Sequence, residues 1–292
     1  MNSRLSLPLA ALLVSSMIFV SCAEDPNAIR SDSPHADLIG QPIDSGFRPE
    51  KDGFSFANFD DRDFPQKFDV QAFLDTVGGG PRVCVDGVTD PCVLTKEATI
   101  FADTVNEARR AGHCEGMVVL AAARHHWKLS PATAELKPTE PVVNGIVRAF
   151  ATIFLPEVQA EARSWKENSL ADTVAELASA LADGRIDYGM GIYRADGGHE
   201  VLPYAIEYPN PTTARVLVYD PNWPMVERYV ELDLKTDRWR FSFAATDQAT
   251  DPYAWSGGNA DLDLNSIPLR AAALEARGVD LTPPIEFGKP EG

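Results

Sequence analysis

The stretch that decides the fold reads GHCEGMVVLAAARHH and occupies residues 112–126. Its middle, from Met117 to Ala123, is apolar on every face, so a helix here must be buried on all sides. Gly112 permits a turn before the helix, and Cys114 stands at the helix start. Free backbone N–H groups and the helix dipole stabilise a thiolate at that position. We therefore expect a buried central helix with a thiol at its N-terminus.

Further helices are expected on both sides of this central one. Capping residues and apolar residues spaced by three or four predict them. They are residues 70–77 after a cap at Asp69, a segment from Thr95 to Gly112, residues 142–154, residues 158–165, and a helix capped by Asn168 and closed by Gly184.

After this last helix the apolar period changes from three or four residues to two, which is typical of strands. The expected strands are 188–193, 199–207, 215–220, 227–234 and 238–245, and turn-forming residues join them. Short connections of this kind favour an antiparallel meander. Helices followed by such a sheet indicate an α+β domain with a buried central helix packed on an antiparallel sheet.

Composition and charge exclude several classes of protein. The 292 residues are 45% hydrophobic and 24% charged, which is a globular profile and not a collagen-like, coiled-coil or disordered one. The 26 Lys and Arg residues face 43 Asp and Glu residues, giving a net charge of -17. Such a surface repels phosphate, so nucleic acid is not an expected partner.

The N-terminus reads as an export signal. Arg4 precedes an apolar run over residues 5–20, and Ser21 and Cys22 are followed by polar residues. This arrangement resembles the bacterial lipoprotein signal, in which the cysteine is acylated. We expect a signal peptide over residues 1–22, lipidation of Cys22, a flexible tether over residues 23–47 and a membrane-anchored place in the bacterial cell envelope, facing the periplasm or the exterior. A plain secretory signal or a transmembrane helix is the alternative, although the run is short for a span.

Export also bears on the other three cysteines. Cys84 and Cys92 lie in RVCVDGVTDPCV, where turn residues separate them. A disulfide between them is expected in an oxidising compartment. Cys114 is then left as a free thiol, either buried as a small apolar residue or reactive.

Three residues together could perform nucleophilic chemistry. A thiol nucleophile needs a base and a third group that orients the base. Cys114 supplies the thiol, and His199 follows two glycines at the mouth of a strand. Asp220 ends the next strand on the face of Val216 and Val218, where an antiparallel neighbour could bring its carboxylate to the His199 ring.

Each of these residues has a purely structural alternative. Cys114 could be a packed core residue, His199 a turn residue, and Asp220 and Asn222 parts of one Asp-Pro-Asn turn. The order of Cys, His and Asp, with the thiol at a helix start and the other two on consecutive strands, favours a catalytic triad. Asn222 remains the alternative orienting residue.

The segments GHCEGMVVLAAARHH, GGHEVLPYAIEY and RVLVYDPNWP resemble the papain-like cysteine peptidase superfamily, nearest to bacterial secreted members with a GHCxGM motif. The upstream DGFSFANF segment and the Cys84 to Cys92 insert are also similar to that group, so the resemblance covers roughly residues 48–250. It implies a papain-like fold with Cys114 as the nucleophile, His199 as the general base and acid, and Asp220 as the orienting group.

The sequence departs from this family at the oxyanion hole. Papain-like enzymes often place Gln six residues before the cysteine, and here that position is Ala108. Asn106 is the nearest side-chain amide and is a possible oxyanion donor. It could equally be a polar residue on an exposed helix face, and the backbone N–H of Cys114 could serve in either case.

These observations lead to an expected organisation and function. We expect a hydrolase domain over residues 48–252 and a loosely attached tail over residues 253–292. The sequence contains no metal-binding or phosphate-binding motif, so no cofactor and no metal are expected. The expected function is hydrolysis of amide bonds in a peptide or protein substrate. A transglutaminase-like acyltransferase and a non-catalytic surface binding module on the same scaffold are the alternatives.

Overall fold

The computed structural model describes residues 29–278 and 289–290. The expected signal peptide, the lipidation site at Cys22 and the first residues of the expected tether lie outside the described residues. The helices, with short 3-10 turns labelled η, are η1 (Ala36–Leu38), α1 (Pro49–Asp52), α2 (Val70–Val77), α3 (Lys96–Ala108), η2 (Arg109–Ala111), α4 (Cys114–His126), η3 (Thr133–Glu135), α5 (Glu140–Ala151), η4 (Thr152–Phe154), α6 (Pro156–Trp165), α7 (Leu170–Ala182), η5 (Asn259–Asp261) and α8 (Ile267–Glu275). The strands are β1 (Ile43–Asp44), β2 (Cys84–Thr89), β3 (Cys92–Leu94), β4 (Leu129–Ser130), β5 (Tyr188–Arg194), β6 (Gly197–Asn210), β7 (Thr213–Tyr219), β8 (Glu227–Asp233), β9 (Arg238–Phe241), β10 (Trp255–Gly258), β11 (Leu262–Ser266) and β12 (Lys289–Pro290).

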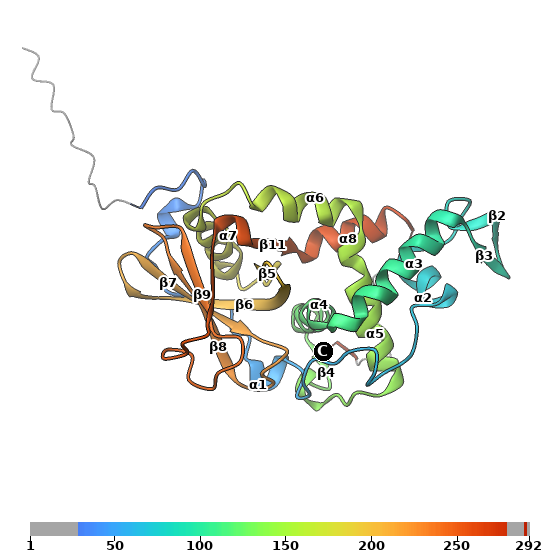
Figure 1. Ribbon diagram of the computed structural model, residues 1–292, viewed down its shortest axis with the longest axis horizontal. Helices are drawn as coiled ribbons and strands as arrows, with labels where there is room; N and C mark the ends of the chain where they lie inside the picture. The colour runs from blue at the N-terminus through green and yellow to red at the C-terminus, as the bar shows by residue number, and fades with distance from the viewer. Residues whose placement is uncertain (1–28, 279–288, 291–292) are drawn as a thin grey trace, which may run out of the picture.

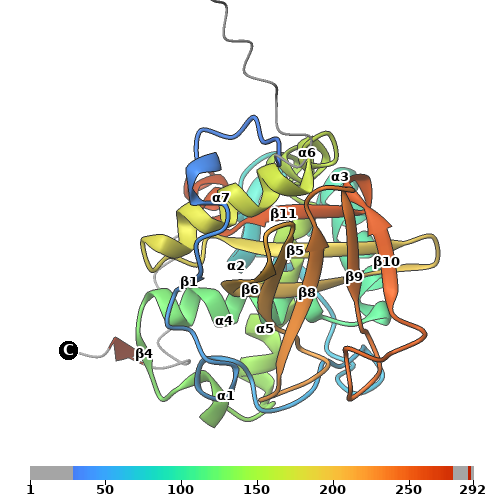
Figure 2. The same cartoon turned by 90° about the vertical axis from the view of Figure 1, so that its left-hand side faces the viewer.

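The architecture is α+β, as expected, and is built on one large antiparallel sheet. Its strands follow the order β10-β9-β8-β7-β6-β5-β11, and β1 pairs with β6 beside this path. Figure 1 shows the sheet on one side of the molecule and most helices on the other, with α4 between them. Figure 2 shows the same sheet face-on, with strands β8, β9 and β10 side by side. The meander from β5 to β9 arises from the short turns that the sequence predicts.

The central helix α4 is buried as its composition requires. Most of its residues from Glu115 to Ala122 are buried, including Met117, Val118 and Ala121. The helix contacts both β6 and α5, and within its apolar run only Val119 and Ala123 are partly exposed. At Gly116, a Cβ would collide with the backbone oxygen of Ile146 in α5. This close crossing of two helices holds the start of α4 in place.

The other predicted helices form, with one corrected cap. The Asp69 side chain accepts a hydrogen bond from the backbone N–H of Ala72 at 2.9 Å and starts α2 at Val70. The cap of α7, in contrast, is Ser169 and not Asn168. The Ser169 hydroxyl and the Asp172 carboxylate each bond to the other residue's backbone N–H, which forms a capping box.

The expected tether over residues 23–47 is wrong from residue 29 onward, where the described residues begin. Strand β1 pairs with β6, with Ile43 opposite Ile206. The Phe47 side chain is completely buried. Further upstream, the Ser31 hydroxyl donates to Asp172 at 2.6 Å. Apolar side chains spaced too far apart to form a period nevertheless find partners on the folded domain, so residues 29–47 belong to it.

The expected tail at residues 253–292 is also wrong for most of its length. Strand β11 pairs with β5, with Leu264 opposite Met190, and all five of its residues are buried. Helix α8 follows and packs against α6. The polar run at Asp263 and Asn265 conceals this strand in the sequence, because its polar side chains have partners only in the folded protein.

The disulfide between Cys84 and Cys92 is present, as predicted. It links the two strands of the β2–β3 hairpin, which projects from the helical side of the molecule beside α3 (Figure 1). Within residues 29–278 and 289–290, no single helix is long and apolar enough to cross a membrane. Only the bent pair made by Glu140–Phe154 and Pro156–Trp165, with an angle of 66° between its halves, meets those criteria together.

Candidate active site

The candidate nucleophile, Cys114, is the first residue of α4. It is half-buried and is the free cysteine of the described chain. The first helical hydrogen bond runs from the N–H of Met117 to the carbonyl of His113, so the preceding N–H groups lie at the open end of the helix. These groups and the helix dipole place a positive potential at the thiol.

The candidate base, His199, lies between this thiol and a carboxylate. Its Nε2 is 2.7 Å from Oδ1 of Asp220, and the side chain of Cys114 is close enough to interact with the ring and raise its pKa. Since Nε2 is occupied by Asp220, Nδ1 is the nitrogen that remains for the thiol. The structure therefore brings Cys114, His199 and Asp220 together from α4, β6 and the end of β7.

The sheet register explains why the two strand residues meet. Leu202 of β6 lies opposite Tyr219 of β7, so Asp220 falls beside Val201 and diagonal to His199. Alternate residues of a strand share a face, so His199 and Val201 point to the same side. The carboxylate of Asp220 lies on that side as well, as the alternation of β7 predicts.

The pKa of His199 is strongly perturbed. Burial by itself lowers it, but the negative charge of Asp220, the hydrogen bond to that carboxylate and the contact with Cys114 raise it more, to about 10. The ring is only 5% exposed. At neutral pH the imidazolium is therefore the favoured form, which is the state that a thiolate–imidazolium pair needs.

Aromatic side chains enclose the imidazole. The ring of Phe241 stacks at 6.1 Å from the His199 ring, and Phe243 meets it edge-on at 5.2 Å. Trp255 stacks on Phe243 with ring centres 4.5 Å apart. These neighbours exclude water from the His199–Asp220 contact on the side of β9 and β10.

The Asp220 turn is held by its own residues and by a buried arginine. The backbone N–H of Asn222 donates to Asp220 Oδ1 at 2.8 Å, whereas the Asn222 amide has no hydrogen-bond partner among the described residues. Asn222 therefore supports the carboxylate and does not replace it. Arg228 is completely buried, stacks on Trp223 at 4.3 Å and interacts electrostatically with Asp220.

The other proposed amide, Asn106, is engaged elsewhere. Its Nδ2 donates to the carbonyl of Phe68 at 3.0 Å, and its Oδ1 accepts from the N–H of Phe68 at 2.9 Å. This pair of bonds fixes the segment before α2. The contacts of Asn106 thus indicate a structural role, and none of the described contacts joins it to Cys114.

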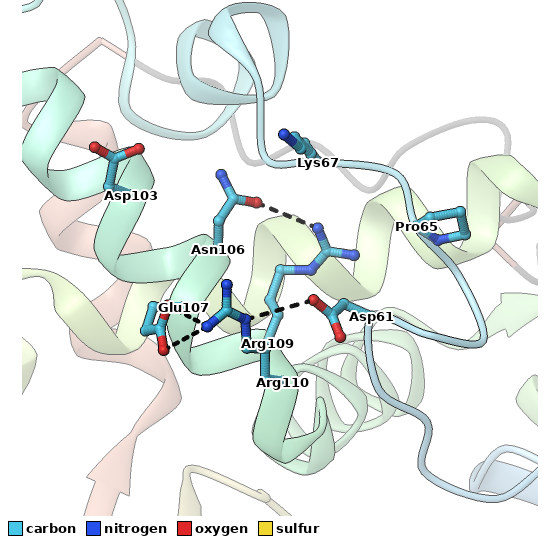
Figure 3. Close-up of a pocket in the computed structure, with 8 residues that line it drawn as sticks. All are labelled: Asp61, Pro65, Lys67, Asp103, Asn106, Glu107, Arg109 and Arg110. Atoms are coloured by element: carbon cyan, nitrogen blue, oxygen red, sulfur yellow. Dashed lines mark hydrogen bonds and ion pairs between the residues drawn. The ribbon is translucent and has the colours of Figure 1, made fainter.

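Asn106 lies in a pocket of about 500 Å³ between α3 and the loop before α2 (Figure 3). Three acidic and three basic side chains line it, and some of them pair with one another. Arg110, for example, pairs with Glu107 at 2.7 Å.

Arg109 is buried and donates through Nε to His113 at 2.9 Å. His113 is also buried, and burial lowers its pKa to about 4, so it is neutral and packs beside the site without titrating near neutral pH.

A buried polar cluster beside the nucleophile has no counterpart in the sequence reasoning. Glu115 follows Cys114 and forms a buried ion pair with Arg270 of α8. Glu200 follows His199, and Asn265 bridges it to Asp263, donating at 3.4 Å and 3.0 Å. Burial raises the pKa of Asp263 to about 7 and raises that of Glu200 well above its ordinary value. The one signal of this cluster in the sequence is that Glu115 and Glu200 directly follow Cys114 and His199.

Asn58, in the loop after α1, is another residue that the sequence did not single out. Its side chain accepts a hydrogen bond from the backbone N–H of His113, and its own backbone N–H donates to the carbonyl of Pro221, each at 2.8 Å. Asn58 thus touches the residue before Cys114 and the residue after Asp220. It lies in the DGFSFANF segment, but nothing in a local pattern distinguishes this amide from a loop residue.

No protein-family model, curated protein or solved structure matches this chain. The case for a function therefore comes from the chain's own residues and their geometry.

Proposed function

We propose that this chain is a papain-like cysteine hydrolase that cleaves amide or peptide bonds through Cys114, His199 and Asp220. The observation that carries the proposal is the position of His199, whose ring lies 2.7 Å from Asp220 and interacts with the side chain of Cys114, so that both neighbours raise its pKa. The thiol lies at the N-terminus of a buried helix, where a thiolate is stabilised. Each residue thus has the neighbour that its role requires.

The reaction begins with attack of the Cys114 thiolate on the carbonyl carbon of the substrate. A carbon–sulfur bond forms, and the carbonyl π electrons move to the oxygen. When the carbonyl reforms, the carbon–nitrogen bond breaks and the amine leaves with the proton of the His199 imidazolium. Water then attacks the thioester and gives a proton to His199, and the carboxylic acid leaves as the thiolate is regenerated. Asp220 holds the imidazole and stabilises its charged form throughout.

We also propose that the protein is exported and anchored by lipid on Cys22. The Cys84–Cys92 disulfide supports export, because disulfides persist in oxidising compartments outside the cytoplasm, and the signal-like N-terminal sequence is the basis for the anchor. The cell envelope of a bacterium is such a location, and a peptide or protein there is the substrate class that the proposal implies.

A mixed-peptide digestion tests the catalytic proposal. Purified wild-type protein and the Cys114→Ala variant are incubated with a library of peptides of diverse sequence, and new peptide ends are identified by mass spectrometry. We expect cleavage by the wild type alone. Added methylamine distinguishes the rival reaction, because an acyltransferase yields methylamides where a hydrolase yields acids. Equal product patterns for both proteins would favour a binding module and contradict the proposal.

A further inference from the structure

We infer that Asn58 is the side-chain donor of the oxyanion hole, an inference that rests on the proposed cysteine hydrolase. Attack on a carbonyl creates a negative oxygen, which needs hydrogen-bond donors beside the nucleophile. The backbone N–H of Cys114 lies at the open end of α4 and can supply one. Both ends of the Asn106 amide, in contrast, are hydrogen-bonded to the backbone of Phe68. A second donor therefore has to come from another segment.

Two hydrogen bonds, one from the side chain and one from the backbone, hold Asn58 against the turn that precedes the nucleophile. Oδ1 accepts from the N–H of His113, the residue before Cys114, and the backbone N–H of Asn58 donates to Pro221 in the Asp220 turn. One residue thus joins the turn that carries the thiol to the turn that carries the carboxylate. Donors act on an oxyanion most effectively when they are already oriented.

Fixing Oδ1 leaves Nδ2 as the available end of the amide. Nδ2 has no hydrogen-bond partner in residues 29–278, and Asn58 is only half-buried, so the donor remains accessible. It lies against Gly112, where a Cβ would come within 2.7 Å of it. Gly112 also has a φ of +119°, which side chains rarely adopt. The turn before Cys114 thus leaves space for this amide.

Two reactions of the same thiol separate an oxyanion role from a structural one. Iodoacetamide alkylates Cys114 at a saturated carbon, with no oxyanion formed. p-Nitrophenyl acetate acylates it through a tetrahedral oxyanion, and the released nitrophenolate is measured as a burst. For Asn58→Ala we expect acylation to slow about 10²- to 10³-fold, as for loss of one oxyanion donor. Alkylation should stay near the wild-type rate, so the ratio of the two rates falls.

Matched variants control for damage to the loop. Asn58→Asp keeps the acceptor for His113 and lacks the Nδ2 donor, so its ratio should fall as well when both rates are compared at their limiting pH. Asn106→Ala removes the other amide and should keep the wild-type ratio. A wild-type ratio in both Asn58 variants overturns the role of Asn58. A wild type that forms no acyl-enzyme overturns the proposed hydrolase itself, which is a different result.

Discussion

His199 is a buried side chain that carries a charge. Taking an imidazolium out of water is unfavourable, and only a close counter-ion reverses this. Asp220, at 2.7 Å and completely buried, is that counter-ion, and the pKa of His199 rises to about 10 as a result. The charged state of His199 therefore depends chiefly on this one carboxylate.

This dependence gives a prediction for the two residues of the Asp220 turn. In Asp220→Ala the imidazolium loses its counter-ion, so the pKa of His199 falls from about 10 toward or below its ordinary value of 6.5. The thiolate–imidazolium pair is then weaker, and alkylation of Cys114 needs a higher pH. Asn222→Ala keeps the Asp220 carboxylate and should leave the profile near wild type. Iodoacetamide labelling from pH 4 to 11 measures both, and a profile altered only in Asn222→Ala would assign the orienting role to Asn222.

Asp263 predicts a pH dependence of stability. Burial raises its folded-state pKa from 3.8 to about 7, so the folded state holds a proton that the unfolded state releases in this range. Its contribution therefore lowers the free energy of unfolding as pH rises from about 4 to 7, by no more than about 4 kcal/mol. Asp263→Asn keeps the Oδ1 acceptor for Asn265 and removes the titration.

Urea denaturation of wild type and Asp263→Asn at pH 4, 5.5, 7 and 8 measures this difference. The free energy of unfolding of the variant minus that of the wild type should rise up to pH 7 and stay constant above pH 7. A difference that does not change with pH would mean that Asp263 is already ionised throughout the range.

At the scale of elements, α8 is tied to α4 by the Glu115–Arg270 ion pair. Arg270 is 2% exposed and also donates to Thr152 at 2.7 Å. Removing one partner of a buried pair leaves an uncompensated charge, which costs about 3 to 5 kcal/mol. Arg270→Met should therefore lower the free energy of unfolding by that amount, whereas Glu115→Gln together with Arg270→Met should cost less than the single change.

Chemical denaturation of the single and double variants tests this coupling. Arg277 pairs with Glu157 at the surface, at 2.9 Å, and provides a matched control in the same part of the chain. Exposed pairs contribute about 0 to 1 kcal/mol, so Arg277→Met should have little effect. An effect of Arg270→Met no larger than that of Arg277→Met would contradict a stabilising role for the buried pair.

Elements with a clear period could be predicted from the sequence. Helix α2 matches the predicted residues 70–77, because its cap and apolar spacing are local properties. The meeting of His199 and Asp220 also followed from strand alternation and short turns. Strand β11 could not be predicted, since Asp263 and Asn265 are polar residues in a buried strand. Their partners, such as Glu200, are more than 60 residues away and become neighbours only on folding.

At the scale of the whole molecule, the disulfide lies in a hairpin that projects from the helical side. Closing so short a loop restricts the unfolded chain and stabilises the fold by about 2 to 3 kcal/mol. The double change Cys84→Ser and Cys92→Ser should lower the melting temperature and leave the rate of Cys114 alkylation unchanged. A slower alkylation would show that the hairpin supports the site directly.

The proposed lipid anchor also belongs to this scale. Cys22→Ser removes the sulfur that would carry the acyl chains, so the protein should leave the membrane fraction. Fractionation of cells that express each form, followed by detection of the protein, measures the change. Ser21→Ala keeps Cys22 and a small residue before it, and serves as a neighbouring control. Unchanged attachment of Cys22→Ser would show that the N-terminal segment is not a lipoprotein signal.

The place of β11 at the edge of the sheet has a consequence for how the protein matures. A ribosome makes β5 and α4 long before it makes β11 and α8. Until β11 and α8 have left the ribosome, the outer edge of β5 is open and Glu115 lacks its counter-ion Arg270. A nascent chain therefore holds the thiol of Cys114 on an incompletely supported helix until β11 and α8 have packed in place.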